Sequence, residues 1–344
     1  MKKIIVPLLM AAILTAAAAA PAAQQAPDAK QSAKVFIPKE VKEPMEAGMA
    51  AKTARLDLPF EIFRTQYLPA QQAFYQVFFL KIKNADLGFA PVTAPAVVDP
   101  AAPIAPAKVK AVVNVFVQFH QAENGVPGKL IKEIYIPASF EADQAGFDPE
   151  QADWYTVGYP LMPGEYLATI AICSQDLSKI GIQYSSANLP DPKSFTSSLD
   201  TTPVFFMKEY KQVQAPEQKP EMHKGFFAYS VIQVTPSLDN VFTVGQPLDL
   251  FTYVFGCQPK SGSTYDVEIV FEVNQGDKPA IKFAPGNFDS PLISLPLTLK
   301  QTLQIKQGDQ VRSETRDLPA GSYTFVMKIK DKVSGNVGEK KIDF

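Results

Sequence analysis

Hydrophobic and polar residues alternate with a period of two along parts of this chain. The clearest stretch runs from 113 to 120, with one apolar side (Val113, Val115, Val117, Phe119) and one polar side (Asn114, Gln118, His120). Successive side chains of a strand point to opposite faces, so this alternation predicts a half-buried β-strand. The turn sequence NGVPG at 124–128 and the apolar run at 131–136 predict a strand that returns beside it.

Other features favour the same class of structure. Residues 74–82 form a β-rich run with aromatic side chains on both faces. The chain contains 30 prolines in 344 residues, and proline is excluded from helix interiors and from central strands. This composition favours many short strands joined by firm turns. The sequence therefore predicts an all-β fold.

The strand patterns occur twice. LMPGEY at 161–166 matches LPAGSY at 318–323, and the strands that follow match too (Ala168, Ile170 and Ile172 with Phe325, Met327 and Ile329). An earlier strand also repeats, with Val113, Val115, Val117, Phe119 and Gln121 matching Val267, Ile269, Phe271, Val273 and Gln275. Two strands that match in the same order at nearly the same spacing predict a tandem duplication of one sandwich fold.

The repeated Leu-x-x-Gly-x-Tyr element has a specific structural meaning. Gly164 and Gly321 would make the tight corner between two sheets, and Tyr166 and Tyr323 would open the next strand. The tyrosine ring can then join the core while its hydroxyl bonds a nearby backbone group, as in the tyrosine corner of immunoglobulin-like sandwiches. We therefore assign these four residues a structural role.

The opposite faces of the two corner strands differ in polarity. In the second repeat this face carries Lys328 and Lys330, which require water. In the first repeat it carries Leu167, Ala171 and Cys173. We expect the first face to be covered by the N-terminal leader, by a proline-rich excursion or by the other domain.

The patterns divide the chain into segments. Residues 1–22 have the basic start, short apolar run and Ala-Pro-Ala site of a signal peptide, which predicts export to the periplasm or outside the cell. Next comes a flexible or loosely docked leader (23–52). It is followed by a first Ig-like sandwich (53–210) with a Pro/Ala-rich excursion (90–107), a linker (211–222) and a second Ig-like sandwich (223–344). After signal cleavage no segment is expected to span a membrane.

Both halves resemble the immunoglobulin or fibronectin-type sandwich modules of exported bacterial proteins. The ending LPAGSYTFVMKIKDKVSG, residues 318–335, is similar to the last strands of the sandwich modules in secreted GWxTD-type proteins. The GWxTD signature itself is absent from this chain. The resemblance covers mostly the last third of each predicted domain and implies architecture rather than activity.

Charge and cysteine content narrow the possible partners. With 33 basic and 35 acidic residues the formal net charge is −2, whereas nucleic-acid and anionic-membrane surfaces need a basic stripe. Two cysteines, Cys173 and Cys257, fall in different halves of the chain. They are free and partly buried, bridged between the domains, paired with another chain, or reactive.

The sequence contains no recognised catalytic, cofactor-binding or metal-binding motif. The two histidines, His120 and His223, have no second histidine or cysteine at ligand spacing, and both are expected on the solvated surface. We therefore predict no enzyme activity, no cofactor and no metal.

Two segments remain as candidate binding surfaces. Trp154, Tyr155 and Tyr159 would form a glycan- or protein-binding patch if exposed, or else fill the core or the domain interface. Val204, Phe205 and Phe206 would be an edge strand able to accept a partner strand, or else the plain final strand of the first domain.

These features favour a non-enzymatic exported binding or scaffold protein that acts through its sandwich surfaces. The partner would be another envelope protein or a glycan. The alternatives are an accessory carbohydrate-binding protein that uses exposed aromatic residues and a hydrolase with an unrecognised site.

Overall fold

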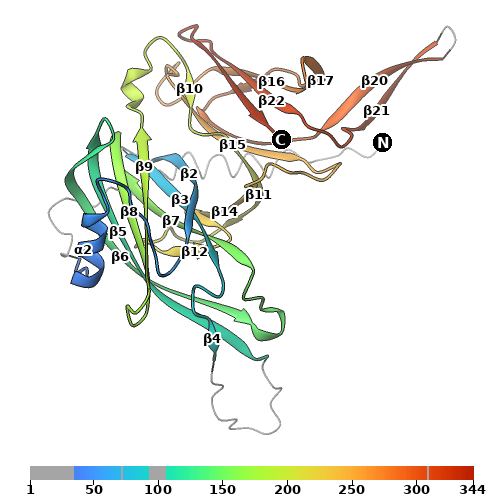
Figure 1. Cartoon of the computed structure of the whole chain (residues 1–344). Coiled ribbons are helices and arrows are strands. Elements are labelled where there is room, and N and C mark those ends of the chain that lie inside the picture. The colour runs from blue at the N-terminus through green and yellow to red at the C-terminus, as the bar shows by residue number, and fades with distance from the viewer. Residues whose placement is uncertain (1–34, 71–72, 93–105, 308–309) are drawn as a thin grey trace. The chain divides into compact units, whose positions relative to one another are not determined.

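The computed structural model describes residues 35–70, 73–92, 106–307 and 310–344 (Figure 1). The contacts between residues divide the chain into two units. We call Gln24–Pro190 with Gln214–Val231 the N-terminal unit, and Asp191–Val213 with Ile232–Phe344 the C-terminal unit. Most described residues lie in antiparallel strands, so the fold is all-β as the sequence predicts.

The N-terminal unit contains two sheets and one helix. Its first sheet has the order β1-β9-β8-β5-β4 with β6 also bonded to β5, and its second has the order β12-β7-β3-β2. The elements are α2 (Lys39–Ala47), β1 (Arg55–Leu56), β2 (Glu61–Ala70), β3 (Ala73–Lys83), β4 (Ala90–Pro91), β5 (Lys108–Glu123), β6 (Val126–Asp143), the 3₁₀ turn η1 (Gln144–Gly146), β7 (Ala152–Leu161), β8 (Gly164–Ser174), β9 (Ile180–Leu189), β12 (Met222–Lys224) and β13 (Phe227–Tyr229).

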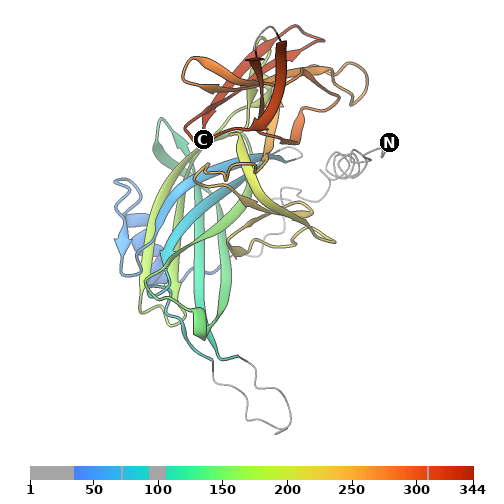
Figure 2. The same cartoon turned by 90° about the vertical axis from the view of Figure 1, so that its right-hand side faces the viewer.

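The apolar side of the predicted strand forms the core between these two sheets. Val113, Val115, Val117 and Phe119 of β5 are all fully buried. The ring of Phe119 lies 6.0 Å from that of Phe78 on β3, in the second sheet. The long β5–β6 hairpin runs through this unit and is visible in Figure 2. The apolar residues of the alternating stretch thus lie in the core between the two sheets.

Helix α2 covers the outer face of the first sheet (Figure 1). Val41 and Met45 lie one helical turn apart and are completely buried. They pack with Phe116 of β5, with Ala171 and Cys173 of β8, and with Ile180 and Ile182 of β9. The cover expected over Ala171 and Cys173 is therefore the leader. Residues 39–47 of the leader form this docked helix, which agrees with the docked and not with the flexible interpretation of the leader.

The C-terminal unit also contains two main sheets. One has β10-β15-β11-β14 with β19 bonded to β15, and the other has β17-β16-β22-β23 with β18 bonded to β16. A separate hairpin, β20–β21, follows β19. The elements are the 3₁₀ turn η2 (Pro192–Ser194), β10 (Asp200–Thr201), β11 (Phe205–Gln212), β14 (Ile232–Pro236), β15 (Leu248–Phe255), β16 (Val267–Gln275), β17 (Lys278–Lys282), β18 (Gly286–Phe288), β19 (Leu292–Leu297), β20 (Lys300–Gln307), β21 (Gln310–Asp317), β22 (Thr324–Asp331) and β23 (Val337–Asp343).

Side chains from both sheets meet in the core of the C-terminal unit. Phe206 of β11 and Leu250 of β15 pack in one cluster with Phe271 of β16 and Phe325 of β22. On the other face of β22, Lys328 and Lys330 are exposed, as the sequence predicts. In the N-terminal unit α2 covers the outer face of the corner strand, whereas in the C-terminal unit the matching face of β22 carries exposed lysines.

The two repeats pair their strands in the same register. In the N-terminal unit Val115 lies opposite Ile172, and Val117 opposite Ile170. At the matching positions of the C-terminal unit Ile269 lies opposite Ile329, and Phe271 opposite Met327. The hairpins that follow also agree, since Ile172 pairs with Gly181 and Ile329 with Gly338.

Matched glycines show how far this similarity extends. A Cβ at Gly181 would overlap the carbonyl oxygen of Leu58, and a Cβ at Gly338 would lie 2.8 Å from the carbonyl oxygen of Leu199. In each unit a preceding segment approaches the strand after the corner strand (β9 or β23) so closely that only glycine fits there.

The division into units follows different boundaries from those predicted. The predicted linker, residues 211–222, contains the last two residues of β11 and the first residue of β12. Strand β12 pairs with β7 of the N-terminal unit. Residues 191–210, assigned to the first domain, belong to the C-terminal unit. The predicted signal peptide (1–22) and residues 93–105 of the predicted excursion lie outside the described residues.

Candidate functional site

The predicted aromatic patch does not gather on the surface. Tyr155 and Tyr159 of β7 are buried, whereas Trp154 is half-buried. The Tyr155 ring contacts Phe140 edge-on at 4.8 Å, and the Tyr159 ring stacks on Phe119 at 5.5 Å. Tyr155 and Tyr159 therefore fill the core between the sheets, which was the alternative to a binding patch. The half-buried Trp154 ring alternates with them along β7 and lies 6.0 Å from the ring of Phe79.

The predicted edge strand is an interior strand. Phe205 and Phe206 pair with β15 in an antiparallel ladder. On the other side, the carbonyl oxygen of Phe206 accepts a hydrogen bond from the amide of Ser237, and β14 pairs from Met207 onward. Contrary to the edge interpretation, the segment that begins at Val204 presents no free ladder, because β11 lies between two neighbours.

The corner residues make the same contact in both units. The hydroxyl of Tyr166 donates to the carbonyl oxygen of Met162 at 3.0 Å, and that of Tyr323 donates to the carbonyl oxygen of Pro319 at 2.8 Å. Gly164 has a φ of +146°, which side chains rarely tolerate. A Cβ at Gly321 would lie 3.3 Å from the ring of Tyr323. All four residues shape the corners.

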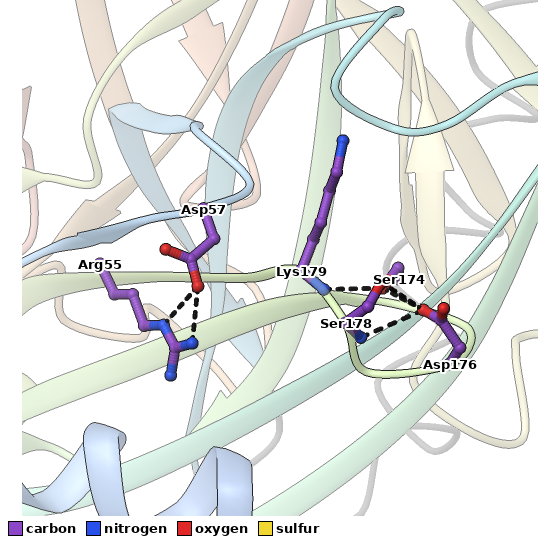
Figure 3. Close-up of polar contacts among 6 residues, drawn as sticks. All are labelled: Arg55, Asp57, Ser174, Asp176, Ser178 and Lys179. Carbon is purple, nitrogen blue, oxygen red and sulfur yellow. Dashed lines mark hydrogen bonds and ion pairs between the residues drawn. The ribbon is translucent and has the colours of Figure 1, made fainter.

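The loop between β8 and β9 holds an acidic side chain within its own turn (Figure 3). The exposed carboxylate of Asp176 accepts hydrogen bonds from the hydroxyls of Ser174 and Ser178 and from the amide of Ser178. Stabilisation of the charged form by these donors lowers the pKa of Asp176 to about 2. The hydrogen bonds of Asp176 therefore stabilise the turn between β8 and β9.

His120 is buried on the outer face of the first sheet, which corrects the prediction that it faces solvent. Burial lowers its pKa, whereas Glu46 and Glu133 act to raise it. Beside it, Glu133 accepts hydrogen bonds from Gln118 and from Lys42 of α2, both at 3.0 Å. The polar side of β5 thus forms a buried polar cluster that contacts the helix covering this face.

Both cysteines carry free thiols. Cys173 is fully buried beneath α2, and Cys257 is partly buried in the C-terminal unit. Burial raises the pKa of each thiol to about 12. A reactive cysteine needs a lowered pKa and access to solvent, so the geometry disfavours a nucleophilic role for either thiol.

The C-terminal unit has a hollow over the outer face of β16, β22 and β23. Its volume is about 400 Å³, and its lining includes Glu268, Lys328, Lys330 and Glu339. Lys328 also bonds Glu272 at 2.9 Å, and this contact lowers the pKa of the glutamate. Such paired charges are typical of a solvated surface and not of a catalytic site.

Three side chains able to bind a metal meet next to β7. Glu217, Glu221 and His223 each offer one ligand atom, and these atoms lie within 4.8 Å of one another. His223 Nε2 lies 2.9 Å from Glu217 Oε1. Sequence reasoning assigned the glutamates to a linker and His223 to the surface. The spacing Glu-x-x-x-Glu-x-His was the available signal.

No protein-family model and no curated protein matches this chain. Within the described residues, no helix is long and apolar enough to cross a membrane.

Proposed function

We propose that this chain is a non-enzymatic exported protein that binds another envelope protein, and that its two units are Ig-like sandwiches. The signal-like residues 1–22 support export. The shared strand register and the two tyrosine corners support the Ig-like assignment. The observation that carries the binding function is the free edge of β6.

Strand β6 is long and is bonded on one side only. It comprises 18 residues, Val126–Asp143, all in one strand beside β5. No other described strand is hydrogen-bonded to it. The matching edge of the C-terminal unit is divided between β17, of five residues, and β18, of three. Proteins commonly shorten their edge strands to prevent pairing with other chains, so a long free edge favours recognition.

The side chains of β6 define where a partner strand would add. Ile131 and Tyr135 are exposed, while Ile134 and Ile136 face the core. Pro137 has no amide hydrogen and therefore interrupts the ladder. A partner strand would add along residues 128–136, with backbone hydrogen bonds supplying affinity and Ile131 and Tyr135 supplying selectivity.

Strand addition recognises a polypeptide backbone, which favours a protein partner over a glycan. The burial of Tyr155 and Tyr159 also removes the stacking surface that carbohydrate binding would use. A hydrolase would need a nucleophile or an acid–base pair in a cleft. The described hollow in the C-terminal unit presents paired surface charges instead.

Site-specific photo-cross-linking tests this proposal. A photoreactive residue replaces Tyr135 in β6 or, as the matched control, Lys278 in the short edge strand β17. After irradiation of intact source cells, mass spectrometry identifies the captured proteins. We expect one dominant envelope protein at position 135 and none at position 278. Equal capture at both positions, or no protein captured at position 135, would contradict binding through β6.

A further inference from the structure

The cluster of Glu217, Glu221 and His223 lies on a segment of the N-terminal unit that strand pairing holds in place. Strand β12 pairs with β7, which places His223 opposite Thr156. Further on, the amide of Gly225 donates to the carbonyl oxygen of Trp154 at 3.0 Å, and the ring of His223 stacks on Phe226 at 4.7 Å. The imidazole is therefore held at a fixed position, as a ligand site requires.

The contact between His223 and Glu217 lacks its expected hydrogen bond. Nε2 lies 2.9 Å from Glu217 Oε1, and only 10% of the His223 side chain is exposed. Nevertheless, Nε2 is buried and makes no hydrogen bond among the described residues. A ring-nitrogen lone pair and a carboxylate oxygen repel each other at this distance unless a cation or a proton lies between them.

The charge of the cluster also favours a cation. Two carboxylates converge on one imidazole. Among the described residues, no lysine or arginine forms an ion pair with either glutamate. Two negative charges held close together destabilise each other, and a bound divalent ion would remove that repulsion.

We propose that Glu217, Glu221 and His223 bind one divalent transition-metal ion, and that Zn²⁺ is the ion of choice. Ligand distances to zinc are about 2.0–2.2 Å, so two ligand atoms of a tetrahedral site stand about 3.3–3.6 Å apart. Nε2 and Oε1 lie 2.9 Å apart, and a small rotation of the Glu217 side chain would open this separation to the tetrahedral value. Glu221 is exposed, and rotation of its side chain brings its carboxylate to the same ion.

The ligand atoms, one imidazole nitrogen and two carboxylate oxygens, determine which ion the site prefers. Imidazole favours Zn²⁺ and related transition metals, whereas Ca²⁺ and Mg²⁺ prefer sites built from oxygen alone. Three protein ligands leave one position of a tetrahedral site to water. The ion would close the loop from 217 to 223 and hold β12 against β7. This inference does not depend on partner binding through β6.

Zinc titration of the purified, metal-free chain tests the site. Calorimetry measures binding to the wild type and to three variants: His223→Gln, Glu221→Gln and, as the matched control, Glu165→Gln. Glu165 is an exposed glutamate of the same unit that lies outside the cluster. Circular dichroism of the metal-free variants verifies that each is folded. Cobalt substitution gives an independent absorption signal from the coordinated ion.

We expect one zinc ion per wild-type chain and the same affinity in Glu165→Gln. Glu221→Gln should bind at least about tenfold more weakly, and His223→Gln should lose both zinc binding and the cobalt spectrum. Because Glu221 is exposed, its substitution leaves the fold intact. Absence of zinc binding by the wild type, or equal binding by folded His223→Gln, would overturn the proposal.

Discussion

The two corner tyrosines, Tyr166 and Tyr323, make the same hydrogen bond in the two units. Each ring is buried, and each hydroxyl donates to the carbonyl oxygen four residues earlier. Burial raises the pKa of Tyr166. The hydroxyl thus remains protonated and able to donate up to high pH. The bond ties the corner to the strand that it opens.

Removal of either corner hydroxyl should destabilise its unit. Tyr166→Phe and Tyr323→Phe each delete one partly buried hydrogen bond and leave a carbonyl oxygen unpaired, at a cost of about 0.5–1.5 kcal/mol in the free energy of unfolding. Urea denaturation measures this loss. Tyr135→Phe is the control, because the Tyr135 hydroxyl bonds Asn114 on the exposed surface. Equal losses in all three variants would contradict a special role for the corners.

The burial of His120 makes the N-terminal unit sensitive to acid. Burial lowers the folded-state pKa of His120 below its ordinary value of 6.5, so the unfolded chain binds the proton more readily. Stability should therefore be lost as the pH falls from 6.5 through this lowered pKa. The opposing charges of Glu46, Glu133 and Lys42 face the same ring.

Unfolding measured between pH 7 and pH 5 tests this effect. The substitution His120→Gln should flatten the dependence of stability on pH, because glutamine does not titrate. An unchanged pH dependence in the folded variant would assign the acid sensitivity to other groups.

Some residue positions could be predicted from the sequence and others could not. Alternation located the inward side of β5 because the period of two is a local property. It could not show that Tyr155 and Tyr159 are buried, because their burial depends on β5 and β6 of the facing sheet, which come from other parts of the sequence. The surroundings of His223 could not be predicted for a similar reason, because its partner Glu217 lies in a segment without periodicity.

Among the elements, α2 departs most from expectation. Ile37, Val41 and Met45 recur at intervals of four and form an apolar stripe, which is the signal that sequence reasoning left unused. Pro44 and the polar composition of the leader favoured a flexible segment instead. Packing outweighs these preferences, because the stripe covers an apolar sheet face that would otherwise meet water.

Undocking of α2 should expose Cys173. In a Cys257→Ser background, Cys173 is the sole thiol, and its pKa of about 12 leaves about a thousandfold less thiolate at pH 8 than the ordinary value near 9 does. Val41→Asp places a charge in the buried interface. We expect it to accelerate reaction of Cys173 with a thiol reagent, while near-native circular dichroism shows that the sheets remain folded.

Lys39→Asp is the matched control, since it introduces the same side chain on the exposed side of α2. It should leave the reaction of Cys173 slow. Fast reaction in the control, or slow reaction in Val41→Asp, would show that α2 does not protect the thiol.

At the scale of the molecule, the repeated strands and corners could be predicted from the sequence. The order in which the chain passes between the two units could not. Matching strands and corners are encoded locally, and they pair in the same register in both units. The two units follow other boundaries than the predicted domains, because β12 pairs with β7 after β10 and β11 of the other unit along the chain. A three-residue strand in a polar, proline-containing segment carries too little pattern to reveal its partner.

This interleaved path has a consequence for the order in which the protein is made. On the ribosome, β7 is complete at Leu161, but β12 and the buried Phe227 that finish the N-terminal unit follow about 60 residues later. Synthesis proceeds at about 5–20 residues per second, so the edge of β7 stays uncovered for several seconds. During that interval residues 155–157 of β7, which β12 pairs in the finished protein, lack their partner strand.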